Sequence, residues 1–172
     1  MEEQELLDIV NDKDNVIGQD TKNNKFIKGL ISRNVAIFIL DNDGKLLITK
    51  RSSHKKSFPN RYDLAACGNV KASESYREAA EREVIEELSI KCNLKFLGKI
   101  FNEFKENDIK IKYFTGIFLG HFSGEVKLSD ELVELKRLTS KEIEGLINEN
   151  KDLFTPGFVK DFIFVKDKLK NL

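Results

Sequence analysis

The sequence contains no tryptophan and only two residues each of cysteine, histidine and proline. Cys67 and Cys92 are too few for a disulfide framework or a thiolate zinc site. His54 and His121 cannot supply a cluster of imidazole ligands. Any metal ion bound by this chain would therefore need carboxylate oxygens as ligands.

The chain also has no excess of charge of either sign and no long apolar run. It contains 29 basic and 29 acidic residues, so its formal net charge at pH 7 is zero. We therefore expect neither nucleic acid nor a membrane as a partner, and an anionic ligand must be held by local charge. The acidic start MEEQELLDIV lacks the features of a signal peptide, and no run reaches membrane-spanning length. These absences predict a cytoplasmic protein.

Segments typical of strands and helices alternate along the 172 residues, and no linker or repeat divides them. The alternation predicts one domain, residues 1–172, of the α/β class with a mixed sheet. Strands are expected in two hairpins, 6–19 and 35–51, and then over 94–104, 109–122 and 133–139. Helices are expected from Ser75 onward, over 140–150 with Ser140 as the N-cap, and over 155–172 with Pro156 in the first turn.

The helix that begins after Ser75 has a well-defined start. Ser75 and Glu78 have the spacing of a capping box, in which each side chain bonds to the backbone of the other residue. Ala80, Val84 and Leu88 follow at intervals of four and form an apolar stripe. The sequence therefore predicts a helix that packs on the sheet along this stripe and leaves its other faces free.

Glu83, Glu86 and Glu87 are spaced so that their carboxylates share one face of this helix. Like charges placed so close together repel, and a bound divalent cation would remove that repulsion. Mg²⁺ and Mn²⁺ prefer oxygen ligands and leave positions open for phosphate oxygens and water. The cluster therefore predicts a phosphate-handling enzyme. The alternative, considered on these residues alone, is a solvated helix face stabilised by salt bridges.

The longer segment GNVKASESYREAAEREVIEELSI, residues 68–90, decides between these alternatives. The positions of Gly68, Glu74, Arg82 and the three glutamates match the Nudix box, so the chain resembles a Nudix hydrolase over most of its length. The resemblance implies an α/β/α sandwich in which residues 1–30 form an N-terminal hairpin extension. It also implies hydrolysis of an organic, possibly nucleoside, diphosphate linked to a moiety X, with Mg²⁺ or Mn²⁺ as cofactor.

Carried over to this chain, the resemblance assigns roles to individual residues. It implies that Glu83, Glu86, Glu87 and the carbonyl of Cys67 are metal ligands, and that Glu74 and Arg82 form a structural ion pair. The catalytic set is expected to be Arg82, Glu86, Glu87 and Glu131. A base outside the box would come from one of five later acids, of which Glu131 is preferred: Glu103, Glu106, Asp108, Asp130 and Glu131.

Substrate contacts are expected near the basic loop that follows the second hairpin. Its cations can meet phosphate groups: Lys50, Arg51, Lys55, Lys56 and Arg61. Four aromatic residues can stack on a base or pack on a prenyl chain, or they can belong to the core: Phe58, Tyr62, Phe104 and Tyr113. The chain departs from the box at Ser89, where glycine is usual and a left-handed backbone is common at a helix end.

Two alternative functions remain open. Residues 46–70 also resemble type I isopentenyl diphosphate isomerase, in which a cysteine at the position of Cys67 is catalytic and Glu106 would face it across the substrate. The histidines that those enzymes use in a metal site are replaced here by Ser32 and Asn69. A Nudix fold can also serve as a non-catalytic diphosphate-binding module, although no box carboxylate is lost here. The sequence leaves the oligomeric state open, a homodimer included.

Overall fold

The computed structural model describes residues 5–170. Part of the predicted N-terminal extension, residues 1–4, and the end of the predicted last helix, residues 171–172, lie outside the described residues. The elements follow in this order: β1 (Leu6–Val10), β2 (Val16–Thr21), α1 (Lys22–Lys28), β3 (Ile31–Leu40), β4 (Leu46–Arg51), β5 (Tyr62–Asp63), β6 (Ala66–Asn69), α2 (Tyr76–Leu88), β7 (Leu94–Glu106), β8 (Ile109–His121), β9 (Leu132–Leu138), α3 (Ser140–Glu149), a 3₁₀ turn (Lys151–Leu153) and α4 (Pro156–Leu169).

Strand β3 is the centre of a mixed sheet. It pairs antiparallel with β1, β4 and β6, and parallel with β8 along its whole length. The hairpin of β7 and β8 is joined by Asn107 and Asp108, which both have positive φ values, of 49° and 64°. Such a two-residue turn with positive φ matches the twist of the flanking strands, so β7 continues to Glu106, past its predicted end at residue 104.

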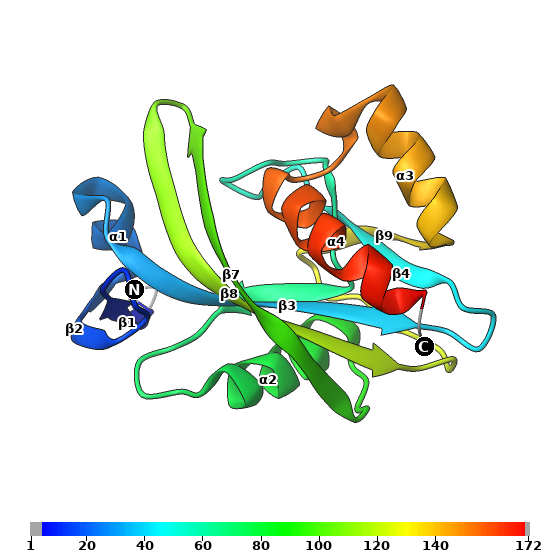
Figure 1. The fold of residues 1–172 in the computed structure, drawn as a ribbon, viewed down its shortest axis with the longest axis horizontal. Helices are drawn as coiled ribbons and strands as arrows, with labels where there is room; N and C mark the ends of the chain where they lie inside the picture. Colours follow the sequence, from blue (N-terminus) through cyan, green and yellow to red (C-terminus); the bar gives the residue numbers. More distant parts are fainter. Residues whose placement is uncertain (1–4, 171–172) are drawn as a thin grey trace.

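Helices cover both faces of the sheet (Figure 1). Alternate residues of β3 point to opposite faces, because side chains in a strand have a period of two. Val35, Ile37 and Ile39 pack with the apolar stripe of α2, while Ala36 and Phe38 pack with α4. The predicted α/β/α sandwich with a mixed sheet is therefore confirmed. Within residues 5–170, no helix is both long and apolar enough to cross a bilayer.

Two local predictions need correction. Helix α1 was not predicted; it begins after Thr21, whose side chain accepts a hydrogen bond from the Asn24 amide, and ends at Gly29 with φ of 62°. Its seven residues are too few to show a helical period. The N-cap of α3 is Thr139, not Ser140, because Thr139 stands three residues before Glu142 and completes a capping box with it.

Candidate active site

Helix α2 carries most of the predicted site and begins where the sequence predicted. The Ser75 hydroxyl accepts a hydrogen bond from the Glu78 amide at 3.2 Å, and the Glu78 carboxylate accepts one from the Ser75 amide at 2.9 Å. Ala80, Val84 and Leu88 are buried in the core. This packing sets the rotation of α2 about its axis, so that its buried carboxylates face strand β6.

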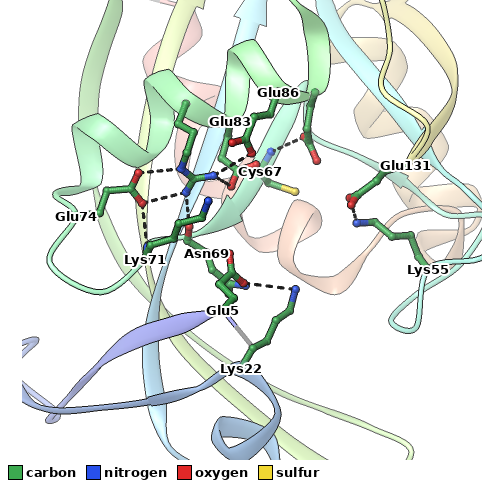
Figure 2. A network of polar contacts seen from close by, with 12 residues as sticks. Glu5, Lys22, Lys55, Cys67, Asn69, Lys71, Glu74, Glu83, Glu86 and Glu131 are labelled. Carbon is green, nitrogen blue, oxygen red and sulfur yellow. Dashed lines mark hydrogen bonds and ion pairs between the residues drawn. The ribbon is translucent and has the colours of Figure 1, made fainter. Parts of the chain in front are cut away.

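Arg82 bonds to three carboxylates of this region, those of Glu74, Glu83 and Glu86, which are labelled in Figure 2. Its Nε and one Nη donate to the two oxygens of Glu74 at 2.8 and 2.9 Å, a bidentate pair. Its other Nη donates to Glu83 at 2.5 Å and to Glu86 at 3.1 Å. A further bond reaches the carbonyl of Asn69 at 2.9 Å. The predicted ion pair of Glu74 and Arg82 is thus present, and the same guanidinium also orients two predicted metal ligands.

Gly68 leaves the space that Glu83 occupies. It pairs with Val35 of β3, so its missing side chain would point to the face of the sheet that α2 covers. A Cβ atom added there would overlap the carboxylate of Glu83. Glycine is therefore required at this position by the close approach of the helix side chain to the strand.

Replacing Gly68 with alanine is expected to displace the Glu83 carboxylate and disturb its bond with Arg82. We expect a loss of about 1–3 kcal/mol in the free energy of unfolding, typical of overpacking. Any activity that depends on Glu83 should fall about 100-fold, because a small misplacement of a catalytic group is enough. Denaturant unfolding and steady-state assays measure both. Gly18→Ala is the control, since no atom lies within 4 Å of its added Cβ, and equal behaviour of the two variants would contradict the prediction.

Glu87 contacts strand β6 at Cys67, the residue before Gly68. One of its carboxylate oxygens accepts a hydrogen bond from the Cys67 amide at 3.0 Å. Burial, reinforced by the charge of Glu83, raises the pKa of Glu87 to about 8. Burial also raises the pKa of Glu83 to about 7, against the opposing effect of Arg82. Both carboxylates therefore lie where a negative charge is destabilised unless a further positive charge is close.

The three predicted metal ligands share one side of α2 but do not point to a common centre. Glu83 and Glu86 turn oxygens towards Arg82, whereas Glu87 turns one towards Cys67. Within residues 5–170, no group of three acidic, cysteine or histidine side chains is arranged to hold a metal ion. The predicted convergence of three carboxylates is thus not found here, because the guanidinium draws two of them to itself.

The donor set nevertheless suits a divalent cation. Carboxylate oxygens are the ligands that Mg²⁺ and Mn²⁺ prefer. Glu83 and Glu87 are buried, with 8% and 9% of their surface exposed, and the second oxygen of Glu87 has no hydrogen-bond partner within the described part of the chain. A bound cation would supply the positive charge that these buried carboxylates need.

The NUDIX domain family matches residues 30–158, more than half of the chain. The chain belongs to the Nudix family. A relative similar over nearly its whole length is the uncharacterised Nudix hydrolase YfcD of Escherichia coli K12, 32% identical over 170 residues, which cover 97% of this chain and 90% of that protein. Isopentenyl-diphosphate Delta-isomerase 2 of Photorhabdus laumondii subsp. laumondii is 30% identical over 158 residues, covering 91% and 89%.

Solved structures of Nudix proteins have the same fold. The crystal structure of the MutT protein from Methanosarcina mazei Go1 superposes with a TM-score of 0.67 at 26% identity, covering 82% of this chain and 95% of that one. The protein is thus a Nudix hydrolase, which hydrolyses a diphosphate bond in a small-molecule substrate. Enzymes of this family generally use divalent metal ions.

Glu131 comes more than forty positions after the Nudix box helix and lies in a loop that contacts the end of that helix. The Ser129 amide donates to the carbonyl of Glu87 at 2.9 Å, which ties this loop to the end of α2. Glu131 pairs with Lys55 (Figure 2). Against partial burial, the hydrogen bond from Lys55 and the charges of Lys55, Lys22 and Arg51 lower the pKa of Glu131.

The other late acids are placed differently. Glu103 pairs with Lys110 across the hairpin of β7 and β8, and Asp108 occupies the hairpin turn. Glu106 accepts a hydrogen bond from the Phe58 amide at 2.9 Å and joins this hairpin to the basic loop. Asp130 is exposed beside Glu131. Of the five predicted late acids, Asp130 and Glu131 lie in the loop that the Ser129 amide ties to the end of α2, and both are exposed. Glu131 stays the preferred base as a prediction.

The basic loop contributes less free positive charge than the sequence suggested. Arg51 is held by the carbonyl of Ser57 at 2.9 and 3.1 Å and by Asp63 at 3.4 Å. Lys50 lies near Glu134, and Arg61 donates to the carbonyl of Phe154. Burial opposes the charge of Arg51, but the nearby carboxylates of Asp63, Glu87 and Glu131 outweigh burial and raise its pKa. Arg51 therefore positions the loop, while Lys50 and Arg61 are engaged elsewhere.

The candidate aromatic residues divide into two groups. Phe104 lies between Phe58 and Tyr113, with ring centroids 5.6 and 5.8 Å apart, so these three form a continuous row. Tyr62 packs instead with Phe154 at 6.0 Å. The row joins the basic loop to the hairpin of β7 and β8, and Tyr62 belongs to the core beneath α4.

Sequence reasoning missed the residues that α1 and the preceding segment bring to the site. Glu5 accepts a hydrogen bond from the Asn69 side chain at 3.0 Å, and Lys22 lies 3.8 Å from Glu5 (Figure 2). Lys25, on the same helix, is buried. The pattern Thr21 to Gly29, a possible N-cap followed by a C-terminal glycine, is the signal that could have predicted this helix.

Ser89 keeps the left-handed conformation that the Nudix box usually gives to glycine, with φ of 56° and ψ of 32°. We expect Ser89→Gly to raise the free energy of unfolding by about 0.5–1 kcal/mol, because glycine removes the strain but adds freedom to the unfolded chain. Activity should not change. Denaturant titration measures the difference, and a lower stability of the variant would show that the serine side chain is itself stabilising.

Proposed function

We propose that this Nudix hydrolase cleaves the diphosphate bond of an organic, possibly nucleoside, diphosphate with Mg²⁺ or Mn²⁺ bound by Glu83, Glu86, Glu87 and the carbonyl of Cys67. The observation that carries the proposal is the pair of buried carboxylates, Glu83 and Glu87, that α2 presses against the glycine-containing strand β6. Such a placement is unfavourable without a cation.

The residues of the chain have distinct parts in this proposal. Arg82 orients Glu83 and Glu86 through its bonds at 2.5 and 3.1 Å. When bound, the cation would neutralise charge on phosphate oxygens and make a water molecule more acidic. In this proposal the ionised Glu131 carboxylate accepts the proton from the attacking water. Against partial burial, its ion pair with Lys55 lowers its pKa, so release of Lys55 would make it a stronger base. The exposed Glu86 is the alternative base.

The test is an assay of the purified protein with Mg²⁺ and with Mn²⁺ against a panel of diphosphates. The panel contains nucleoside di- and triphosphates, dinucleotide polyphosphates, nucleotide sugars, coenzyme A and isopentenyl diphosphate, and both cleavage and isomerisation are detected. Metal-dependent cleavage supports the proposal and begins to define X. Absence of turnover across the panel would instead favour the diphosphate-binding module.

Isomerisation of isopentenyl diphosphate is a second candidate, because the similar Photorhabdus laumondii protein carries that name and Cys67 lies beside the box carboxylates. Burial, with the charges of Asp63 and Glu87, raises the pKa of Cys67 well above its ordinary value. The thiol therefore stays protonated and can act only as a proton donor at neutral pH. Isomerised product without cleavage in the same assay would establish this activity in place of hydrolysis.

A further inference from the structure

Lys25 of α1 is a buried cation without an anionic partner among the described residues. Its exposed fraction is 3%, and its ammonium forms neither a hydrogen bond nor an ion pair within residues 5–170. The contacts of the ammonium are with the faces of Phe26 and Tyr113, whose ring centroids lie 4.7 and 6.0 Å away. Lys28, on the same helix, instead pairs with Asp20 at 2.7 Å. Burial of an unpaired ammonium is unfavourable, so Lys25 needs an explanation.

The strand register places Lys25 close to the Nudix box strand. Tyr113 of β8 stands beside Ser32 of β3, and two residues further along β3 Asn34 stands opposite Asn69 of β6. Two residues of a strand span about 7 Å, and their side chains share a face of the sheet. The Tyr113 ring that Lys25 contacts therefore lies on the same face of the sheet as the Asn69 side chain, about two residues away along the strands.

Two polar atoms on the same face of β3 also lack partners. The Ser32 hydroxyl oxygen and the Asn34 side-chain oxygen are buried and make no hydrogen bond in the part of the chain that the structure describes. Buried polar atoms without partners are rare in folded proteins. The hydroxyl can donate a hydrogen bond, and the Asn34 amide can present its NH₂ group after a rotation. These groups, together with the ammonium, have the chemistry that a phosphoryl group requires.

We propose that Lys25, Ser32 and Asn34 form a phosphoryl-binding site for the phosphate of the substrate that lies farther from the box carboxylates. This inference rests on the proposed function, because it assigns a second phosphate of the same substrate. Glu5 is the nearby acid. It bonds to Asn69 and lies near Lys22. Burial and the charge of Lys22 lower the pKa of Lys25 to about 8, and the charge of Glu5 opposes this only in part. The N-terminal extension would then be part of the substrate site.

Binding of imidodiphosphate, a diphosphate analogue with a P–N–P bridge, tests the site without hydrolysis. Calorimetric titrations with Mg²⁺ compare the natural protein with Lys25→Met, Ser32→Ala and the control Lys28→Met. We expect the dissociation constant to rise at least tenfold in Lys25→Met and about threefold in Ser32→Ala, with no change in Lys28→Met. Lys25→Met should fold, because methionine keeps the apolar contacts and removes an unpaired charge. Its melting temperature is measured alongside.

Titration with inorganic phosphate distinguishes the source of the phosphoryl group. Tighter binding of imidodiphosphate than of phosphate assigns the site to the substrate, whereas equal binding of both, lost in Lys25→Met, assigns it to free phosphate. Unchanged affinity in a folded Lys25→Met, or no binding to the natural protein, overturns the inference. Cleavage in the panel assay together with unchanged Lys25→Met binding would leave the proposed function standing alone. Lys25-dependent binding without any cleavage would support the phosphoryl-binding site and contradict the proposed hydrolysis.

Discussion

Replacing Glu87 with glutamine is expected to lower kcat/KM for the diphosphate substrate by about 1000-fold, which corresponds to about 4 kcal/mol of transition-state stabilisation. The amide keeps the shape of the side chain and can still accept the hydrogen bond from Cys67, but it is a poor ligand for a divalent cation. The free energy of unfolding without metal should stay within about 1 kcal/mol, because a neutral side chain suits a buried position. Steady-state kinetics measure the loss of kcat/KM, and denaturant unfolding measures the free energy of unfolding.

Glu81→Gln is the matched control for this prediction. Glu81 lies on the same helix, its side chain is 54% exposed, and its nearest basic partner is Arg77 at 3.8 Å. Its replacement should leave both activity and stability unchanged. Full metal-dependent activity in Glu87→Gln would show that the ligand assignment is wrong, and a parallel loss of fold would show that Glu87 has a structural role.

Replacing Arg82 with methionine is expected to affect stability and activity together. The guanidinium donates five hydrogen bonds, to Glu74, Glu83, Glu86 and the Asn69 carbonyl. Removing it leaves at least two poorly hydrated carboxylates without a counter-charge. Because the Arg82 side chain is still 19% exposed, we expect a loss of about 2–4 kcal/mol in the free energy of unfolding, somewhat less than for a fully buried pair.

Activity of Arg82→Met should fall about 100-fold even under conditions in which the variant is folded, because Glu83 and Glu86 lose the group that orients them. Arg77→Met is the control on the same helix: it removes an exposed ion pair with Glu81 and one hydrogen bond to the Leu94 carbonyl, so we expect a loss of about 1 kcal/mol and no change in activity. If Arg82→Met were as stable and active as the natural protein, other contacts would have to position these carboxylates.

Elements with local signals were predictable from the sequence. The capping box of Ser75 and Glu78 acts between neighbouring residues, so α2 begins where the spacing indicated. The turn after β3 likewise depends on neighbours: the Asp41 side chain accepts from the amides of Asp43 and Lys45, and Gly44 has a positive φ of 71°. Helix α1 was missed, because its seven residues are too few to show a helical period and its local signals are only the caps at Thr21 and Gly29.

The candidate site was predictable in its residue types but not in its contacts. The spacing of Glu83, Glu86 and Glu87 indicated a shared helix face, and the structure places them there. Their common metal centre stays a prediction: Arg82 bonds to both Glu83 and Glu86 in this structure, and the sequence does not show which acceptors an arginine selects. Lys50 and Arg61 were plausible phosphate contacts for the same reason: a charge in a sequence does not identify its partner.

The sequence by itself determined the chemistry that this protein can perform: oxygen ligands from a glutamate-rich helix, an arginine to orient them and a glycine to admit them. These features depend on residue type and on spacing within one helix, which local geometry controls. Only the tertiary structure decided which groups surround that helix. Glu131 pairs with Lys55, Glu5 lies near Lys22, and Lys25 packs on Tyr113, because strand pairing and core packing bring distant segments together.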